Sequence, residues 1–256
     1  MYTAGIARKT IYVLCILILL LQCQITVAQD QHKTLKLQIM EQIPYGFVQS
    51  DQTTTGVLFE ILQRISAQSS VSEPVEIVPL LRIYNDMVAS KPICSLFADT
   101  PEVLASEALI LVEPLGFELQ VGILPRKGIL LHDYYDLTDR LIAVPLGIIF
   151  DDRFNNDDSL KKVVTRNYSN SIKMLKLRRV DAVAGALPAL YYIAKLEGMT
   201  QQQIEAPLVF QRFNVHLICS DGVSDEKRSK LKQALLELKQ QGDVKRILSR
   251  YFDIAG

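Results

Sequence analysis

YSNSIKMLKLRRVDAVAGALPALYYIAKLEG, running from Tyr168 to Gly198, is the stretch that decides the fold. Its first part has the residue spacing of an amphipathic helix, and Ser169 or Ser171 offers a hydroxyl that caps this helix. The basic pair at 178–179 marks a turn, and residues 180–184 (VDAVA) then form a predicted buried strand.

A second helix is predicted after this strand. Pro188 suits its first turn, and Gly198 suits the position just past its end. The whole stretch therefore forms an αβα unit of an α/β fold. At its start, Ser169, Asn170 and Ser171 place hydroxyls and backbone amides at a helix N-terminus, which favours a polar or anionic ligand group.

This order of features resembles a known family. A serine-rich helix start, a short helix, a basic turn and the sequence Val-Asp-Ala-Val are similar to the second lobe of the bacterial extracellular solute-binding proteins of family 3. These are the type II periplasmic binding proteins that serve amino-acid ABC transporters. The resemblance implies an α/β fold of two lobes, each a central sheet flanked by helices, joined by two hinge crossings.

The composition is that of an ordinary globular protein. Of 256 residues, 49% are hydrophobic and 22% are charged, and the 28 basic residues equal the 28 acidic ones. No basic excess therefore points to nucleic acid as a partner. No Walker A, GxSxG or HExxH motif occurs, and the three histidines are scattered, so we expect neither a cofactor nor a metal site.

The N-terminus predicts export. A basic pair at 8–9 precedes the apolar run 11–21, and residues 26–28 (TVA) resemble a cleavage site. Residues 1–28 are therefore a predicted signal peptide, and we expect the mature protein in the periplasm. A lipoprotein anchored at Cys23 is the alternative, but a glutamine precedes that cysteine where a small residue is expected.

The predicted mature chain keeps two cysteines, Cys94 and Cys219. An oxidising compartment permits a bridge between them, but two cysteines do not make a disulfide framework. Both lie in apolar runs, so we predict buried free thiols.

The start of the mature chain resembles the opening of the family. Residues 35–40 alternate as in a half-buried strand, and a Pro-Tyr-Gly-Phe loop and a predicted helix over 56–65 follow. In the family an aromatic residue of this loop covers the ligand. The resemblance therefore implies this role for Tyr45 and, less directly, for Phe47. The alternative is that both rings only plug the edge of the lobe.

A candidate for anion recognition follows the next predicted strand, residues 75–80. Ligands of open α/β sheets bind outside the carboxyl ends of the strands, where Arg82 stands. Its guanidinium would pair with a carboxylate or phosphate oxygen. The alternative for Arg82 is a surface side chain paired with Asp86.

A third predicted strand, 93–97, leads to the candidate ligand residues Asp99 and Thr100. The family carries Thr-Pro-Glu-Arg here and holds the ligand carboxylate with that arginine. In this chain Val103 takes the place of the arginine, and Ala186 takes that of the acid that holds the ammonium.

The hydroxyls that many members carry in the second lobe are replaced by Ile148 and Ile149. Burying a zwitterion without charged partners costs several kcal/mol per ion. We therefore expect a small polar or mono-anionic solute rather than a free α-amino acid.

The resemblance covers nearly all of residues 35–253 and implies the domain bounds. Lobe 1 is expected to comprise residues 29–115 plus 217–256, and lobe 2 residues 116–216. Pro114 and Gly116 are residue types that interrupt regular structure, and we expect them to mark the hinge.

The implied function is that of a periplasmic solute-binding protein for transport or sensing, which closes its lobes on a small molecule. Its expected partners are that solute and an inner-membrane ABC permease or sensor domain, and it is expected to be a monomer. The alternative is a dehydratase-like enzyme on the same fold, with Glu113 or Asp99 as the acid–base group. No paired acid–base set stands out, so we expect no enzyme.

Overall fold

The structure is a computed structural model that describes residues 34–71, 73–146 and 151–252. The strands are β1 (Lys36–Met40), β2 (Phe47–Val48), β3 (Thr54–Thr55), β4 (Val75–Val78), β5 (Ile93–Ala98), β6 (Leu109–Pro125), β7 (Leu141–Pro145), β8 (Lys161–Thr165), β9 (Ala182–Ala186) and β10 (Leu208–Ser220). The α-helices are α2 (Val57–Gln68), α3 (Leu80–Val88), α4 (Pro101–Ala105), α5 (Asp152–Asn156), α6 (Tyr168–Lys176), α7 (Leu187–Leu196), α8 (Asp225–Gln240) and α9 (Asp243–Tyr251). Two 3₁₀ helices are η1 (Tyr134–Leu137) and η2 (Gln201–Gln203). The predicted signal peptide, Cys23 included, lies outside the described residues.

Eight strands form one mixed sheet in the order β4-β1-β5-β10-β6-β9-β7-β8. At one end β1 pairs in parallel with β4 and β5, and we call these three strands the β1 group. At the other end β7 pairs in parallel with β8 and β9, and we call these three strands the β9 group. Parallel strands buried on both faces need helical cover, and the helices supply it.

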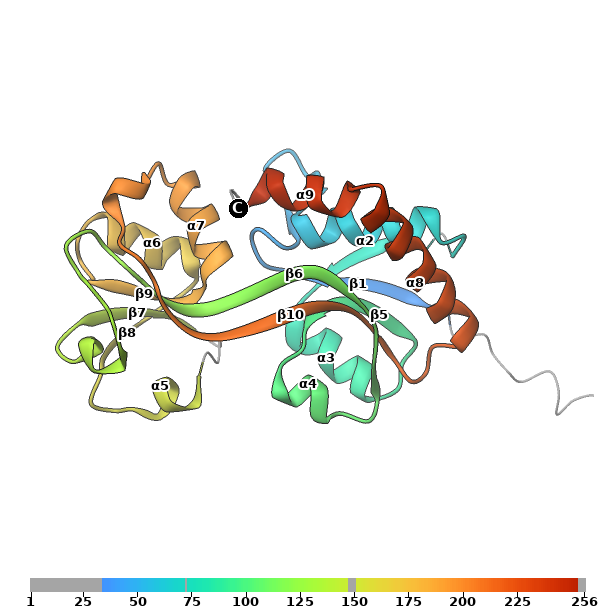
Figure 1. Ribbon diagram of the computed structural model, residues 1–256, viewed down its shortest axis with the longest axis horizontal. Helices are drawn as coiled ribbons and strands as arrows, with labels where there is room; N and C mark the ends of the chain where they lie inside the picture. Colours follow the sequence, from blue (N-terminus) through green and yellow to red (C-terminus); the bar gives the residue numbers. More distant parts are fainter. Residues whose placement is uncertain (1–33, 72, 147–150, 253–256) are drawn as a thin grey trace, which may run out of the picture. The chain divides into compact units, whose positions relative to one another are not determined.

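Two long antiparallel strands join the groups. β6 has 17 residues and β10 has 13, and they pair with each other along most of their length (Figure 1). β10 also pairs with β5, and β6 also pairs with β9. In their shared stretch Pro114 lies opposite His216, so the two segments expected to form the hinge run side by side.

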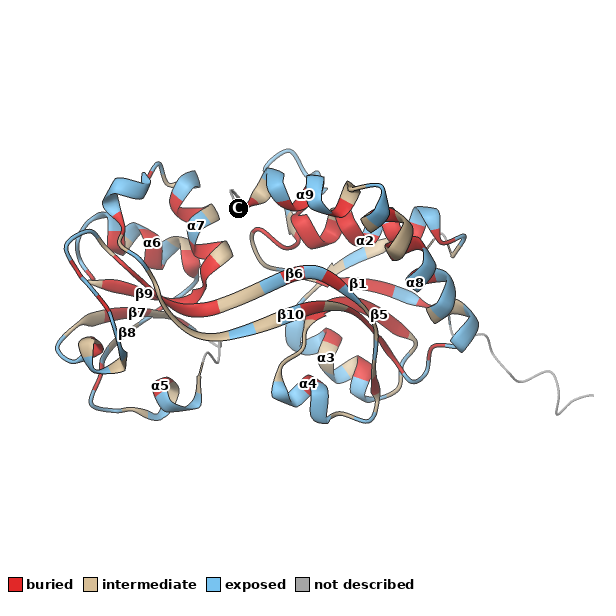
Figure 2. Ribbon diagram, in the orientation of Figure 1, coloured by how far each residue is buried: buried red, intermediate tan, exposed pale blue. Residues whose placement is uncertain are grey.

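The two C-terminal helices return to the β1 group, where α8 and α9 pack against α2 (Figure 1). Ser224 caps α8, because its Oγ accepts the backbone N–H of Lys227 at 3.4 Å. The helix has an apolar stripe whose residues Leu231, Leu235 and Leu238 are buried. Figure 2 shows buried residues concentrated on the strands and on the helix faces that cover them.

The αβα unit forms as predicted, although its details differ. α6 is capped by Asn167, whose side chain accepts the N–H of Asn170 at 3.0 Å, so the prediction of a serine cap is wrong. The helix begins one residue before Ser169, which leaves both serines inside its first turn. The strand β9 starts two residues later than predicted. Gly198 has φ +71° just past α7, as expected for a residue that ends a helix.

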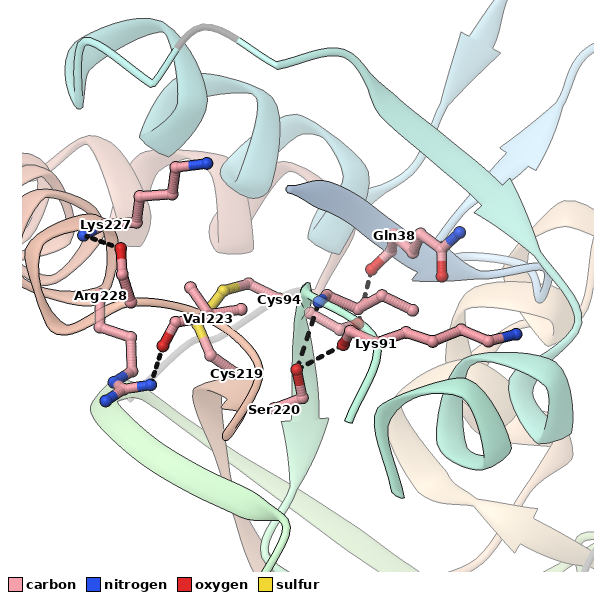
Figure 3. Close-up of a disulfide and its surroundings, with 11 residues drawn as sticks. Gln38, Lys91, Cys94, Cys219, Ser220, Val223, Lys227 and Arg228 are labelled. Carbon is pink, nitrogen blue, oxygen red and sulfur yellow. Dashed lines mark hydrogen bonds between the residues drawn. A yellow bond between two sulfur atoms is a disulfide. The ribbon is translucent and has the colours of Figure 1, made fainter. Parts of the chain in front are cut away.

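A disulfide joins β5 to β10. Cys94 lies directly opposite Cys219 in the ladder, both side chains are buried, and the two sulfurs are bonded (Figure 3). The prediction of free thiols is therefore wrong. The physical reason is that β10 returns beside β5 after 125 residues, which brings together two apolar runs far apart in the sequence. Next to the bridge, the Ser220 hydroxyl accepts the N–H of Ile93 and donates to the carbonyl of Lys91.

Candidate functional site

A seam of tyrosines forms where the loop after β1 meets α6 and the end of β9. Tyr168 is buried, its hydroxyl accepts the backbone N–H of Ala186 at 3.1 Å, and the side chain of Gln42 lies near that hydroxyl. Burial raises the pKa of Tyr168 to about 12, although the N–H of Ala186 and the side chain of Gln42 act in the opposite direction. The Gln42–Tyr168 contact thus ties the loop after β1 to the β9 group.

The small residues of β9 make room for this ring. A Cβ added to Gly185 would lie 2.5 Å from Cε1 of Tyr168, closer than any side chain tolerates. The glycine is therefore required by the close approach of the aromatic ring to the strand.

Tyr45 lies in the same seam, and its hydroxyl has no partner within the described part of the chain. Only 3% of the residue is exposed. Burial raises the pKa of the Tyr45 hydroxyl well above its usual value, and the neighbouring Tyr168 hydroxyl adds to this effect. A buried hydroxyl without a partner is rare in folded proteins and marks a place where an acceptor or donor is missing.

The C-terminal residues of α9 complete the seam. The ring of Tyr251 stacks on Tyr192 of α7 at 5.8 Å, and its hydroxyl contacts Glu60 and Thr55. Burial, followed by the hydrogen bond to Glu60, raises the pKa of Tyr251 to about 12.

Phe252 follows Tyr251 and fills the space behind Tyr45. Its ring stacks on Phe117 at 5.1 Å and lies 6.5 Å from the ring of Tyr45. Aromatic rings at such separations gain from their electrostatic complementarity as well as from burial. The loop after β1, the residue that follows α9 and the crossing strand β6 are therefore packed together.

The predicted site residue Asp99 is bound to the crossing strand β10. One carboxylate oxygen accepts the backbone N–H of Asn214 at 2.7 Å. The other lies 3.3 Å from the side-chain amide of Asn214 and 3.3 Å from Nε2 of His216. Thr100 caps α4 through the N–H of Val103. Both predicted residues thus lie at the carboxyl end of β5, with local partners.

Arg82 lies in the first turn of α3, and its side chain is 63% exposed. Its Nε is 3.9 Å from the carboxylate of Asp86, which also binds Lys91. The hydrogen bond from Lys91 lowers the pKa of Asp86 most, and burial acts against it. The surface pairing considered as the alternative for Arg82 is thus present.

The remaining predicted residues differ in exposure. Phe47 is half-buried and pairs with Thr55 across β2 and β3. Ser169 is half-buried and Asn170 is exposed. Ser171 is fully buried, and its hydroxyl lies 2.6 Å from that of Thr165.

The two clamp positions are apolar and buried. Val103 is 5% exposed inside a separate apolar cluster formed with α3 and β5, and Ala186 is 8% exposed at the start of α7. Ile148 and Ile149 lie outside the described residues.

Of the two acids considered for the enzyme alternative, Asp99 binds β10 as described above, and Glu113 binds α8. The carboxylate of Glu113 binds Lys239 at 2.8 Å and lies 3.8 Å from Lys232, both on α8. In the described ranges no group of three His, Cys, Asp or Glu side chains is arranged to hold a metal ion. None of the described helices has the length and apolar character needed to span a membrane.

Sequence reasoning missed Gln42, Tyr168, Tyr192 and Tyr251 as seam residues. The available signal was Gly185 between alanines, because such a bare strand surface leaves space for a large ring from elsewhere. Nothing local to the sequence indicates which ring fills it.

Comparison with known proteins shows likeness mainly at the level of structure. No family model matches the sequence. A curated protein, the probable amino-acid-binding protein YxeM of Bacillus subtilis (strain 168), is 26% identical over 121 residues. The match covers 46% of this chain and 46% of the relative, so it spans about half of the relative's length.

Three solved structures illustrate the fold. A mutant of ArgBP from T. maritima is 19% identical with a TM-score of 0.65, covering 86% of this chain and 96% of that one. The solute receptor for L-cysteine of Neisseria gonorrhoeae is 19% identical with a TM-score of 0.64, covering 88% and 92%. A histidine kinase sensor domain with similarity to periplasmic binding proteins is 14% identical with a TM-score of 0.64, covering 87% and 97%. This chain therefore has the two-lobed α/β fold of the periplasmic binding proteins.

Proposed function

We propose that this protein is a periplasmic solute-binding protein whose two lobes close on a small molecule. The observation that carries the proposal is the tyrosine seam, because buried polar groups of the β1 and β9 groups meet there. On this proposal lobe 1 comprises residues 29–115 plus 217–256, lobe 2 comprises residues 116–216, and β6 and β10 act as the hinge. Hinge closure about a bound ligand is a common response of such folds.

Export is part of the proposal. The predicted signal peptide favours it, and the Cys94–Cys219 disulfide is of the kind that persists in oxidising compartments such as the periplasm. Transport with an ABC permease and sensing through a membrane receptor both remain within the proposal, since an amino-acid-binding protein and a sensor domain are among the similar proteins. We propose a monomeric binding protein. We propose no enzyme, because Glu113 is bound by lysines of α8 and Asp99 accepts the N–H of Asn214.

The proposed ligand is a small polar or mono-anionic solute. Val103 and Ala186 supply no charge for a zwitterion, and Tyr45 presents an unpaired hydroxyl. An unpaired buried hydroxyl costs about 1–3 kcal/mol, which a ligand that bonds to it would recover. Of the predicted site residues, Tyr45 is therefore the one that we propose most strongly as a ligand contact. Arg82, Asp99, Thr100 and Ser171 would have to exchange local partners to reach a ligand.

Free α-amino acids should bind weakly or not at all. A ligand at a hundredfold excess over its dissociation constant stabilises a protein by about 2.7 kcal/mol, which is easily visible as a rise in melting temperature. The mature protein should therefore be melted with each of the twenty amino acids and then with mono-anionic aromatic and aliphatic metabolites. We expect shifts only in the second set. Large shifts with several amino acids would show that other residues supply the charged clamp.

Replacing Tyr45 with phenylalanine should separate the site from the scaffold. Tyr45→Phe removes an unpaired hydroxyl, so the ligand-free protein should be as stable as the wild type or slightly more stable. The affinity for any ligand found by melting should fall about tenfold, the value of one hydrogen bond of about 1.4 kcal/mol. Isothermal titration calorimetry measures this change.

Arg82→Ala tests the candidate for anion recognition in the same assay. Its side chain is largely exposed and its pairing with Asp86 is loose, so the free energy of unfolding should change by less than about 1 kcal/mol. The melting shift with the mono-anionic set should nevertheless be lost. If it is kept, Arg82 is only a surface charge, and if Tyr45→Phe leaves the affinity unchanged, Tyr45 only plugs the edge of the lobe and its proposed role is wrong.

A further inference from the structure

A basic pocket lies near the β9 group of strands, and its lining residues are not those of the tyrosine seam. It has a volume of about 100 Å³ and is formed by the end of β6, the end of α6 and η2. Four of the lining side chains are cationic and two are amides: Arg126, Lys127, Lys176, Arg178, Gln202 and Gln203. The lining contains no carboxylate.

Backbone contacts hold the walls of this pocket together. The N–H of Lys127 donates to the carbonyl of Gln203 at 2.8 Å, and Arg126 forms an isolated bridge with Ile204. The third wall is the end of α6, where Arg178 follows the helix with φ +56°. Glycine is the residue most often found in this conformation at a helix end, so an arginine there is uncommon.

The cations outnumber the acids that reach them. Arg126 binds Asp181 at 2.7 Å, and Lys127 binds Glu205 at 3.0 Å. Lys176 donates only to a main-chain carbonyl, that of Glu197. For the side chain of Arg178, the described part of the chain provides neither an ion pair nor a hydrogen bond. Among the residues that the structure describes, no anion pairs with two of the four positive charges.

Arg126 gives an independent indication of a missing acceptor. Its Nε–H is buried and has no partner among the described residues, although its terminal nitrogen is paired with Asp181. Nearly all buried donors of folded proteins are paired with protein, water or an ion. Within the described ranges, one guanidinium donor of this lining residue is thus left unpaired.

We propose that the pocket binds a small oxyanion of the phosphate or sulfate type. Guanidinium and ammonium groups form their strongest hydrogen bonds with such oxygens. Pockets for larger organic ligands usually exceed about 300 Å³, so the volume restricts the ligand to a few atoms. The site is separate from the proposed solute site, and its test does not depend on knowing that solute.

The test is calorimetric titration of the mature protein with sodium phosphate and with sodium sulfate, against sodium chloride at equal ionic strength. Direct binding is measured because both oxyanions also stabilise folded proteins by exclusion from their surface. Arg178→Gln should weaken binding about tenfold or more, since it removes a charge-assisted hydrogen bond. Glutamine is chosen because it keeps a non-glycine residue at this positive φ.

Arg179→Gln is the matched control. Arg179 is the next residue, is also exposed, and loses the same charge, but it does not line the pocket. It should bind phosphate as the wild type does. Lys127→Gln provides a second pocket variant in case Arg178→Gln folds poorly, and it too should weaken binding.

Three outcomes would overturn the proposal. The first is the absence of saturable binding of either oxyanion by the wild type. The second is equal weakening by Arg178→Gln and Arg179→Gln, which would indicate a general effect of net charge. The third is binding to vesicles of phosphatidylcholine with phosphatidylglycerol while inorganic phosphate gives no heat, which would make the ligand a lipid surface.

Discussion

Removal of the Cys94–Cys219 disulfide should lower the free energy of unfolding by about 5 kcal/mol. The bridge closes a loop across 125 residues, and the chain-entropy model gives this value for a loop of that length. Domains are stable by only about 5–15 kcal/mol, so the loss is a large share of the total. Urea denaturation of the wild type and of Cys94→Ala/Cys219→Ala, followed by circular dichroism, measures the difference.

The reductant provides the control for this experiment. Dithiothreitol should destabilise the wild type to about the level of the double variant, and it should leave the double variant unchanged. Because both cysteines are buried, reduction should require unfolding and should be slow under native conditions. If alkylation of the unfolded, unreduced protein labels two thiols, the disulfide is absent. The expected decrease in the free energy of unfolding would then not occur.

The elements that sequence patterns predict best are those whose signal is local. In α2 the residues Ile61, Leu62 and Ile65 are fully buried, as their helical spacing requires. The stripe of α8 follows the same rule. A 3.6-residue period can be recognised within a segment of a few helical turns, and it does not depend on any distant segment of the chain.

The start of α6 shows the limit of local chemistry. Asparagine and serine are both strong capping residues, and both occur within five positions of each other here. The choice of Asn167 depends on burial of Tyr168 and Ser171 against the sheet, which fixes where the helix begins. Local preference alone could not decide between them.

The contacts that define the seam and the bridge are non-local. Gln42 meets Tyr168, Asp99 meets Asn214, and Cys94 meets Cys219, each pair more than a hundred residues apart. These contacts depend on the pairing of β10 with β5 and on the contact between the β1 group and the β9 group. The resemblance to a known family implied the two lobes and left these partners undetermined.

The seam should make the protein sensitive to alkaline pH. An exposed tyrosine ionises near pH 10, and burial raises the pKa of Tyr168 to about 12. The folded state therefore favours the neutral hydroxyl. The corresponding stability is present in full below pH 10 and is lost as the pH rises through 12. A difference of about two pKa units corresponds to about 2.7 kcal/mol.

Tyr45, whose pKa is also raised, should add to this loss of stability above pH 10. We therefore expect the free energy of unfolding, measured by urea denaturation, to fall by at least about 3 kcal/mol between pH 10 and pH 12. Tyrosinate absorbance should rise together with the loss of helical circular dichroism. Tyr168→Phe should be less stable at pH 7, because the N–H of Ala186 loses its acceptor. Its stability should nevertheless depend less on pH between 10 and 12. Ionisation of every tyrosine near pH 10 in a protein that stays folded would contradict the burial of these hydroxyls and the seam itself.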